Sequence, residues 1–229
     1  FNTPTAPGDT LTAFFSDTGS TPVSSTISPL PTIWQGGFFV ALKGETPMQY
    51  QKTITLRDGT PCILRGTNSA DAAQVLSIFN LTHAQTDFLL TYPDESRMTV
   101  EEEQQYLAKS ADSTDSIEIC AILDGRIVGT AGISAVGHWE KLRHRAEFGI
   151  SIDKDYWGRG IGRALTLACI DCARTAGYSQ LELDVVAENT AAQALYQSVG
   201  FAEYGRNPRG FRTRSGQWQE LILMRMELN

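Results

Sequence analysis

The chain has 229 residues, of which 41% are hydrophobic and 20% charged, and its formal net charge is −7. These values suit a soluble globular protein with a sizeable core, and they argue against nucleic-acid binding, which requires a basic face. No run of about 18 apolar residues exists, so no membrane association is expected. An acidic balance is compatible with a cationic substrate, although it more often serves solubility.

The first 47 residues differ in composition from the rest. Six of the nine prolines and clusters such as Ser24-Ser25-Thr26 precede Met48, and Lys43 is the only basic residue there. We expect residues 1–47 to form a low-order Ser/Thr/Pro-rich extension, with Met48 as a candidate natural start because the chain begins with Phe1. No basic region followed by an apolar core is present, so a secretory signal is not expected. Residues 48–229 are expected to form one cytoplasmic domain.

The chain after Met48 carries strand and helix patterns in alternation. Asp58-Gly59 and Asp124-Gly125 each lie between apolar runs and predict β-hairpins. Thr99-Val-Glu-Glu102 has the form of a capping box and predicts a helix start. The patterns predict a mixed α/β (α+β) domain with a sheet of about seven strands. The expected strands cover residues 53–56, 61–65, 117–123, 126–133, 145–152, 181–186, a segment from 201, and 221–228, and the expected helices cover 69–81, 99–111, a segment ending at Gly177, and 189–199.

Two of the four cysteines, Cys169 and Cys172, have CxxC spacing. A structural zinc site needs further ligands, and the histidines are scattered along the chain, so no metal is expected. The pair lies on the apolar stripe of a predicted helix, which favours packing in the core.

Gly158-Arg-Gly-Ile-Gly162 links a predicted strand to a helix. Glycine permits left-handed backbone angles and close approach of a ligand, and the free amides of a first helical turn attract anions. The pattern therefore indicates a phosphate or pyrophosphate site. It is not a P-loop, because Arg163-Ala164 follows the glycines in place of Lys-Ser/Thr. It is not a dinucleotide fingerprint either, because Arg163 or Leu165 stands where a small residue is required.

Three segments together resemble the GNAT superfamily of acetyl-CoA-dependent N-acetyltransferases, in particular small bacterial members without an assigned substrate. They are Glu147-Phe-Gly-Ile-Ser-Ile152, Tyr156-Trp-Gly-Arg-Gly-Ile-Gly162 and the stretch from Asn189 to Phe201. The resemblance covers about residues 54–228. It implies a mainly antiparallel sheet, splayed at the middle, with helices on both faces. Trp157 stands where the family often has Gln or Arg, a small departure because backbone amides do most of the binding in this loop.

Acetyl transfer to an amine requires a proton acceptor, because an amine with a pKa of about 10.4 costs roughly 4–5 kcal/mol to deprotonate at pH 7. It also requires a proton donor for the leaving thiolate. The resemblance implies that Glu147 is the base, unless it is structural, and that Tyr196 is the acid. It also implies acetyl-CoA as co-substrate, held by Ile150, Ser151, Ile152, Trp157, Gly158, Arg159, Gly160, Ile161, Gly162 and Asn189.

The acyl acceptor is expected to be a small-molecule or peptide amine, and the protein a monomer or homodimer. Asp87, Phe88, Tyr92 and Glu95 lie in the loop on the family's acceptor side and could recognise the amine, although an exposed polar loop would look the same. The alternative function is a catalytically inactive CoA-binding sensor or partner module of the same fold. The presence of both Glu147 and Tyr196 argues against that alternative.

Overall fold

The computed structural model describes residues 46–137 and 139–228, so the expected extension over residues 1–47 lies almost wholly outside the described residues. The order of strands and helices matches the predicted order. The elements are β1 (Gln51–Thr55), β2 (Pro61–Gly66), α1 (Ala72–Gln85), α2 (Val100–Ala111), β3 (Ile117–Leu123), β4 (Arg126–Ala135), β5 (Arg145–Ile152), α3 (Ile161–Ala176), β6 (Gln180–Val186), α4 (Thr190–Val199), β7 (Ala202–Arg212) and β8 (Trp218–Glu227), with short 3-10 helices at Ser69–Asp71 and Lys154–Tyr156.

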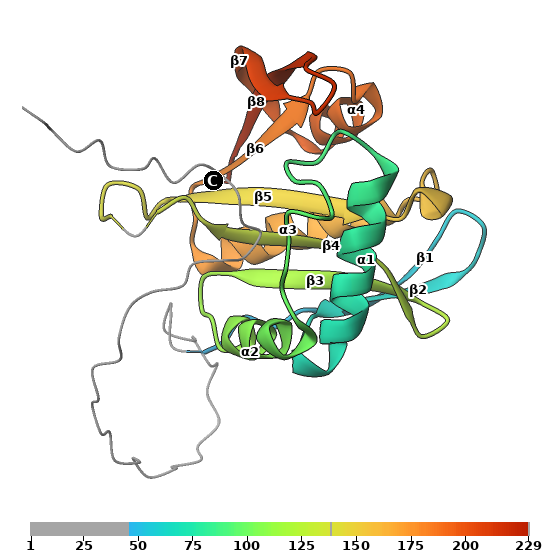
Figure 1. Ribbon diagram of the computed structural model, residues 1–229. Coiled ribbons are helices and arrows are strands. Elements are labelled where there is room, and N and C mark those ends of the chain that lie inside the picture. The colour runs from blue at the N-terminus through green and yellow to red at the C-terminus, as the bar shows by residue number, and fades with distance from the viewer. Residues whose placement is uncertain (1–45, 138, 229) are drawn as a thin grey trace, which may run out of the picture.

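The strands form one sheet in the order β1-β2-β3-β4-β5-β6-β8-β7. The β5–β6 pair is parallel and the other pairs are antiparallel. Helices α1 and α2 cover one face of the sheet and α3 covers the other (Figure 1). The expected mainly antiparallel fold with helices on both faces is therefore confirmed. All eight strands expected from the sequence belong to one sheet, which is one strand more than the approximate size of seven predicted for it.

The sheet opens between its two parallel strands. β5 and β6 pair only from Arg145↔Gln180 to Glu147↔Glu182. Beyond that point β5 stays paired with β4 as far as Ile152, while β6 stays paired with β8 as far as Val186. The two strands therefore separate after Glu147, which confirms the expected splay at the middle of the sheet. We call this point of separation the splay.

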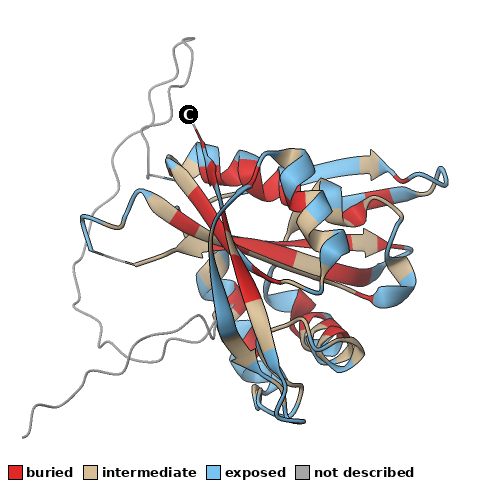
Figure 2. Cartoon of the chain, turned by 90° about the horizontal axis from the view of Figure 1, so that it is seen from above, coloured by how far each residue is buried: buried red, intermediate tan, exposed pale blue. Residues whose placement is uncertain are grey.

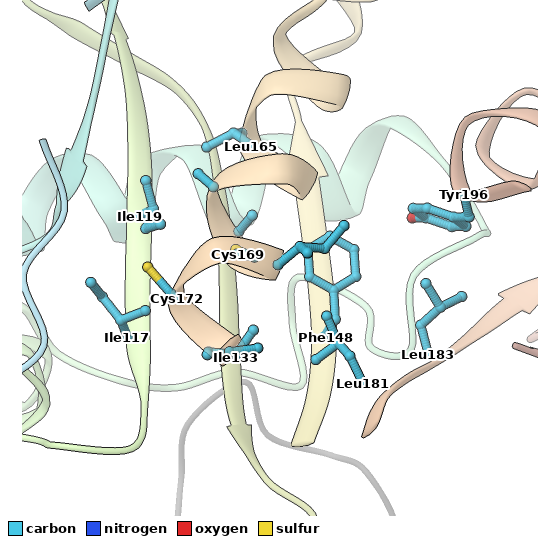
Figure 3. Close-up of a cluster of buried hydrophobic side chains, with 14 of the residues drawn as sticks. Ile117, Ile119, Ile133, Phe148, Leu165, Cys169, Cys172, Leu181, Leu183 and Tyr196 are labelled. Atoms are coloured by element: carbon cyan, nitrogen blue, oxygen red, sulfur yellow. The ribbon is translucent and has the colours of Figure 1, made fainter. Parts of the chain in front are cut away.

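Buried hydrophobic residues form one cluster on each face of the sheet, and Figure 2 marks the buried positions along the strands and helices in red. The larger cluster lies between the sheet and α3, where Leu165, Cys169 and Cys172 pack over Ile119 and neighbouring strand residues (Figure 3). Cys169 and Cys172 are buried free thiols, as expected for core packing. Burial raises the pKa of the Cys172 thiol to about 12, which keeps it protonated and unreactive near neutral pH.

Helix boundaries follow the sequence signals at most ends. The Thr99 hydroxyl accepts from the Glu102 amide at 3.2 Å, and the Glu102 carboxylate accepts from the Thr99 amide at 2.8 Å, so the predicted capping box is present. α1 extends four residues past the expected end near residue 81. The apolar stripe stops there, and within the additional turn the His83 ring stacks on the Phe79 ring with centroids 3.8 Å apart. No helix in the described ranges is both long and apolar enough to cross a membrane.

Two carboxylates are buried between α2 and the sheet. Glu103 on α2 and Glu118 on β3 are each 6% exposed. Burial, reinforced by the nearby Glu103 charge, raises the pKa of Glu118 to about 8, and burial raises the pKa of Glu103 to about 7. Thr67 donates a weak hydrogen bond to Glu118 at 3.4 Å. In this environment the protonated form of Glu118 is favoured.

We expect the protein to lose stability as pH rises from about 5 to about 9. The folded pKa of Glu118 lies above its ordinary value of 4.5, so the folded state binds more protons than the unfolded state between those values. The contribution of Glu118 to the free energy of unfolding is then fully present below its pKa in the unfolded state, and it is lost as pH rises through its pKa in the folded state. Glu118→Gln should flatten this dependence by on the order of 2 kcal/mol in urea unfolding. An equally steep loss in the variant would contradict the assignment.

Candidate active site

The strand edge of β5 at the splay is defined by its register with β4. The Val136 amide donates to the Arg145 carbonyl, and the Asp153 amide donates to the Val128 carbonyl. Because hydrogen-bonded residues alternate along an antiparallel pair, Glu147, Gly149 and Ser151 bond to β4. The backbone groups of the intervening residues point away from β4. Ala146 still pairs with β6, whereas past the last registered pair, Glu147↔Glu182, the backbone groups of Ile150 and Ile152 have lost β6 as a partner.

This alternation along β5 changes the set of residues whose backbone groups could bind a ligand. Ile150 and Ile152 direct their backbone groups to the splay as expected, but Ser151 directs its own to β4 and Phe148 takes its place. The Ile152 carbonyl is already occupied, since the Trp157 indole N–H donates to it at 2.8 Å. The side chain of Trp157 thus fixes the turn that leaves β5. The sequence could not show which of these residues direct their backbone groups to the splay, because that depends on the register between strands.

The glycine loop presents a row of free amides. Gly158 and Gly160 have φ angles of 75° and 99°, and Gly160 is the N-cap of α3. Counting from Gly158, the first backbone amide with a hydrogen-bond acceptor in the protein is that of Ala164, which donates to the Gly160 carbonyl at 3.1 Å. No acceptor among the described residues satisfies the amides of residues 158–163, which include Arg159, Ile161 and Gly162. Such a nest at the positive end of a helix is an anion site.

Long-range contacts support this loop from one side. The Arg159 guanidinium donates to the Asp58 carboxylate at 3.0 Å, and the Arg159 carbonyl accepts from the Arg57 amide at 3.3 Å. The side chain of Arg159 is therefore engaged by the β1–β2 turn, while its backbone amide has no partner among the described residues. Arg57 also donates to the Gly158 carbonyl at 3.3 Å. No local pattern in the sequence could have linked residues a hundred positions apart.

A second support reaches the loop from α1. Gln85 at the helix end donates to the Asp153 carboxylate at 2.9 Å and accepts from the Lys154 amide at 2.8 Å. Asp153 is buried and also accepts from the Asp155 amide. The end of α1 therefore supports the turn that follows β5, and the β1–β2 turn supports the glycine loop that comes after it.

Glu147 lies on β5 at the last residue pair before the strands separate. It is half-buried, and its carboxylate has no hydrogen bond or ion pair with the described part of the chain. Burial, reinforced by the charges of Glu182 and Asp184, raises its pKa to about 7, while Arg145 opposes this shift. A carboxylate with a pKa near the working pH is suited to accept a proton.

Tyr196 on α4 is held by an aromatic cluster. Its ring lies 6.0 Å from the rings of both Phe148 and Phe201, and the residue is 8% exposed. Its hydroxyl has no hydrogen-bond partner among the described residues and points toward β5 and α3 (Figure 3). Burial raises its pKa well above the usual value, which keeps the phenol protonated.

Glu147 and Tyr196 approach the splay from opposite faces of the sheet. Ala146 and Phe148 pack in the core on the α3 side, so Glu147 between them faces the α1 side. Tyr196 contacts Phe148 from the α3 side. A reacting group held at the splay would have a proton acceptor on one face and a proton donor on the other.

Asn189 begins α4 as its N-cap. Its side-chain oxygen accepts from the Ala192 amide at 3.2 Å. The side-chain N–H groups stay available to a ligand, since none of the described residues accepts from them. Its expected role in cofactor binding therefore rests on its amide nitrogen alone.

The loop between α1 and α2 is bridged to the β7–β8 hairpin. Arg214 stacks on the Tyr92 ring at 4.0 Å and pairs with Asp94, and Gln219 donates to the Asp87 carbonyl at 3.2 Å. Glu95 accepts from the Tyr92 amide at 2.7 Å. Of the four expected acceptor residues, Tyr92 and Glu95 are thus used inside the protein, whereas the carboxylate of Asp87 and the ring of Phe88 have no such contact among the described residues.

Two residues near Glu147 were not identified from the sequence. Glu182 and Asp184 lie on β6 on the same face as Glu147. Glu182 accepts from both Arg145 and Gln180, with a 2.7 Å bond to each. The sequence could have predicted their shared face, because apolar and acidic residues alternate from Leu181 to Asp184 and alternate residues of a strand lie on the same face.

Two cavities in the described part of the chain lie away from these groups. One of about 430 Å³ is lined by residues of β1, β2 and α2, and one of about 140 Å³ lies between α1 and β4. Neither contains a residue of the motifs. The candidate site is therefore defined by unpaired backbone and side chains at the splay, which a bound ligand would complete.

Comparison with known proteins relates the chain to one family of enzymes. The model of the acetyltransferase (GNAT) family matches residues 80–201. An L-amino acid N-acyltransferase, MnaT, of Escherichia coli K12 is 27% identical over 169 residues, covering 72% of this chain and 94% of that protein. A GNAT-family acetyltransferase from Streptococcus pneumoniae has a TM-score of 0.70 at 32% identity, covering 72% of this chain and 99% of that one. A Salmonella typhimurium structure, solved with its cofactor acetyl-CoA, has a TM-score of 0.66 at 20% identity, covering 73% and 94%.

Proposed function

The chain belongs to the GNAT family of acetyltransferases, and on this premise we propose that it transfers an acetyl group from acetyl-CoA to the amine of a small molecule or peptide. The observation that supports this most strongly is the splay itself. It has free strand-edge amides, a nest of loop amides beside it, and Glu147 and Tyr196 on opposite faces. We further propose that residues 48–229 form the catalytic domain.

The residues present fit acetyl-CoA as a co-substrate. The amides of residues 158–163 would bind its pyrophosphate. The free edge at Phe148, Ile150 and Ile152 would pair with its pantetheine arm as an added strand does. Acetyl-CoA supplies the activated acetyl group. Asn189 would donate from its side-chain amide to the same arm.

The mechanism we propose is direct attack of the amine in a ternary complex. Glu147, directly or through a water, accepts the proton of the ammonium group. A free amide of β5 donates to the acetyl oxygen as negative charge develops there, an effect typically worth about 10²–10³ in rate. Tyr196 donates its proton to the departing thiolate. The acylated nitrogen then gives up its second proton, which restores the Tyr196 phenol directly or through solvent. Cysteine chemistry is not used, since Cys169 and Cys172 are buried and protonated.

Gly158→Ala is expected to weaken acetyl-CoA binding by about ten-fold, because an L residue resists the φ of 75° that aligns the loop amides. Gly125→Ala is the matched control. Gly125 has a φ of 77° and, like Gly158, has space for an added Cβ with no other atom within 4 Å, but it lies in the β3–β4 turn. Both variants should lose about 1 kcal/mol of stability, and only Gly158→Ala should change the affinity in calorimetry. Equal affinities would remove the loop from the binding site.

Two measurements separate the enzyme from the alternative, a CoA-binding sensor of the same fold. Thermal unfolding should show stabilisation by acetyl-CoA and none by ATP or NADH. Thiol release in the presence of an amine panel should then show turnover. Stabilisation with no thiol release from any amine would support the sensor, and stabilisation by NADH or ATP in place of acetyl-CoA would contradict both functions.

A further inference from the structure

The turn after β5, residues 153–157, joins the two parts of the proposed cofactor site. Ile152 is the last residue of the free strand edge, and Gly158 begins the row of free loop amides. A rotation of this turn would carry the loop amides out of line with the strand edge. The position of the turn therefore decides whether one ligand can bind both parts at once.

Asp153 holds this turn from the inside. The residue is 2% exposed, and its carboxylate accepts from the Asp155 amide at 3.2 Å, which caps the short helix Lys154–Tyr156. The Arg126 guanidinium lies 3.7 Å from the same carboxylate, on a side chain that is 61% exposed. An ionised carboxylate in the interior is costly unless donors surround it. Each further donor that the protein supplies to Asp153 therefore stabilises the turn.

Gln85 supplies such a donor and also an acceptor. Its side-chain N–H donates to the Asp153 carboxylate at 2.9 Å, and its side-chain oxygen accepts from the Lys154 amide at 2.8 Å. A carboxylate in its place would have no donor for Asp153, and an ammonium group would have no acceptor for Lys154. The two contacts together therefore depend on the amide group of a glutamine at this position.

The place of Gln85 in the fold makes it a firm support. It is the last residue of α1, and the buried side chains of Val75 and Ile78 anchor this helix in the core. Figure 1 shows α1 crossing the strands on one face of the sheet. A side chain on a packed helix is held more precisely than one on a loop. The helix therefore fixes the turn with respect to the strands that carry the cofactor edge.

The position of the glycine loop depends on the segments around it. The amides of residues 158–163 have no acceptor among the described residues, so they do not tie the loop down. Asp58 in the β1–β2 turn holds Arg159 within the loop, and Gln85 holds the turn that precedes the loop. Loss of the Gln85 contacts would leave the junction between strand edge and loop without its support from α1.

We propose that Gln85 is a positioning residue for the cofactor site, which fixes the turn after β5 so that the strand edge and the loop amides bind one acetyl-CoA molecule together. This inference rests on the proposed acetyl transfer and adds to it a residue outside the reacting groups. Gln85 acts through Asp153 and Lys154 and not on the acetyl group. Its effect should therefore fall on cofactor binding and not on the chemical step.

Gln85→Met tests the proposal, because methionine keeps the length of the side chain and removes both hydrogen bonds. The Kd of the full chain for acetyl-CoA, measured by calorimetry without an amine, should rise about ten-fold. The KM for acetyl-CoA should rise by a similar factor, while kcat at saturating acetyl-CoA stays within about two-fold of wild type. The calorimetric stoichiometry reports the folded fraction separately, so a partly unfolded preparation still yields the Kd.

Gln74→Met is the matched control. Gln74 lies in the first turn of the same helix and accepts from the Ile127 amide at 3.0 Å, so it also ties α1 to the sheet, but through β4. Its Kd for acetyl-CoA should equal that of wild type. An unchanged Kd in Gln85→Met, an equal rise in Gln74→Met, or a fall in kcat without a rise in KM would overturn the proposal. Wild-type protein that does not bind acetyl-CoA would instead contradict the proposed function.

Discussion

Glu147→Gln is expected to lower kcat/KM for an amine acceptor by about 10²–10³-fold near pH 7. The glutamine keeps the shape of the side chain but cannot accept the proton of the ammonium group. Wild-type kcat/KM should also rise with pH through about 7, because burial raises the pKa of Glu147 to about 7 and the base acts only when ionised. The acidic limb should be absent from the pH profile of the variant.

The fold should survive this change. The raised pKa of Glu147 means that its ionised form is disfavoured in the folded protein, so an uncharged glutamine should leave the free energy of unfolding equal or slightly higher above pH 7. Acetyl-CoA affinity should also stay unchanged. Activity within a few-fold of wild type, with the same pH profile, would show that Glu147 is structural, which was the alternative left open by the sequence.

Tyr196→Phe is expected to lower kcat by about 10²-fold, because the thiolate then leaves without a proton donor. The phenyl ring preserves the contacts with Phe148 and Phe201, and the hydroxyl makes no hydrogen bond in the described structure that would be lost. Stability and acetyl-CoA affinity should therefore change little. Steady-state kinetics and thermal unfolding of the same preparation measure both.

Tyr178→Phe is the matched control for this variant. Tyr178 is also a buried tyrosine, but its hydroxyl donates to the Asp115 carbonyl at 3.0 Å, away from the splay. Its loss should cost about 1 kcal/mol of stability with little effect on kcat, which is the reverse of the pattern at Tyr196. Equal kcat values for Tyr196→Phe and wild type would remove Tyr196 from the acid role.

Local sequence signals predicted most of the fold. The Asp-Gly turns, the Thr99 capping box and the stop at Gly177 each depend on a few adjacent residues, and each is present in the structure. The glycine loop was predicted for the same reason, since left-handed backbone angles at Gly158 and Gly160 require glycine. Glu147 and Tyr196 were identified through the family resemblance, and the structure places both at the splay.

Features that depend on pairing between distant segments could not be predicted. The exchange of Ser151 for Phe148 required the β4–β5 register. The support of Arg159 by Asp58 required the β1–β2 turn to lie against the glycine loop. The pairing of Arg145 with Glu182 required β5 and β6 to lie side by side. Tyr92 and Glu95 were assigned to the acceptor, but the structure shows both in contacts within the protein.

A crystal structure of the chain with bound CoA tests the central claim most directly. The pyrophosphate should lie within hydrogen-bonding distance of the amides of residues 158–163, and the pantetheine arm should run along Phe148, Ile150 and Ile152 with its sulfur beside the Tyr196 hydroxyl. CoA bound elsewhere on the molecule, or an arm that leaves the β5 edge unpaired, would contradict this placement of the active site.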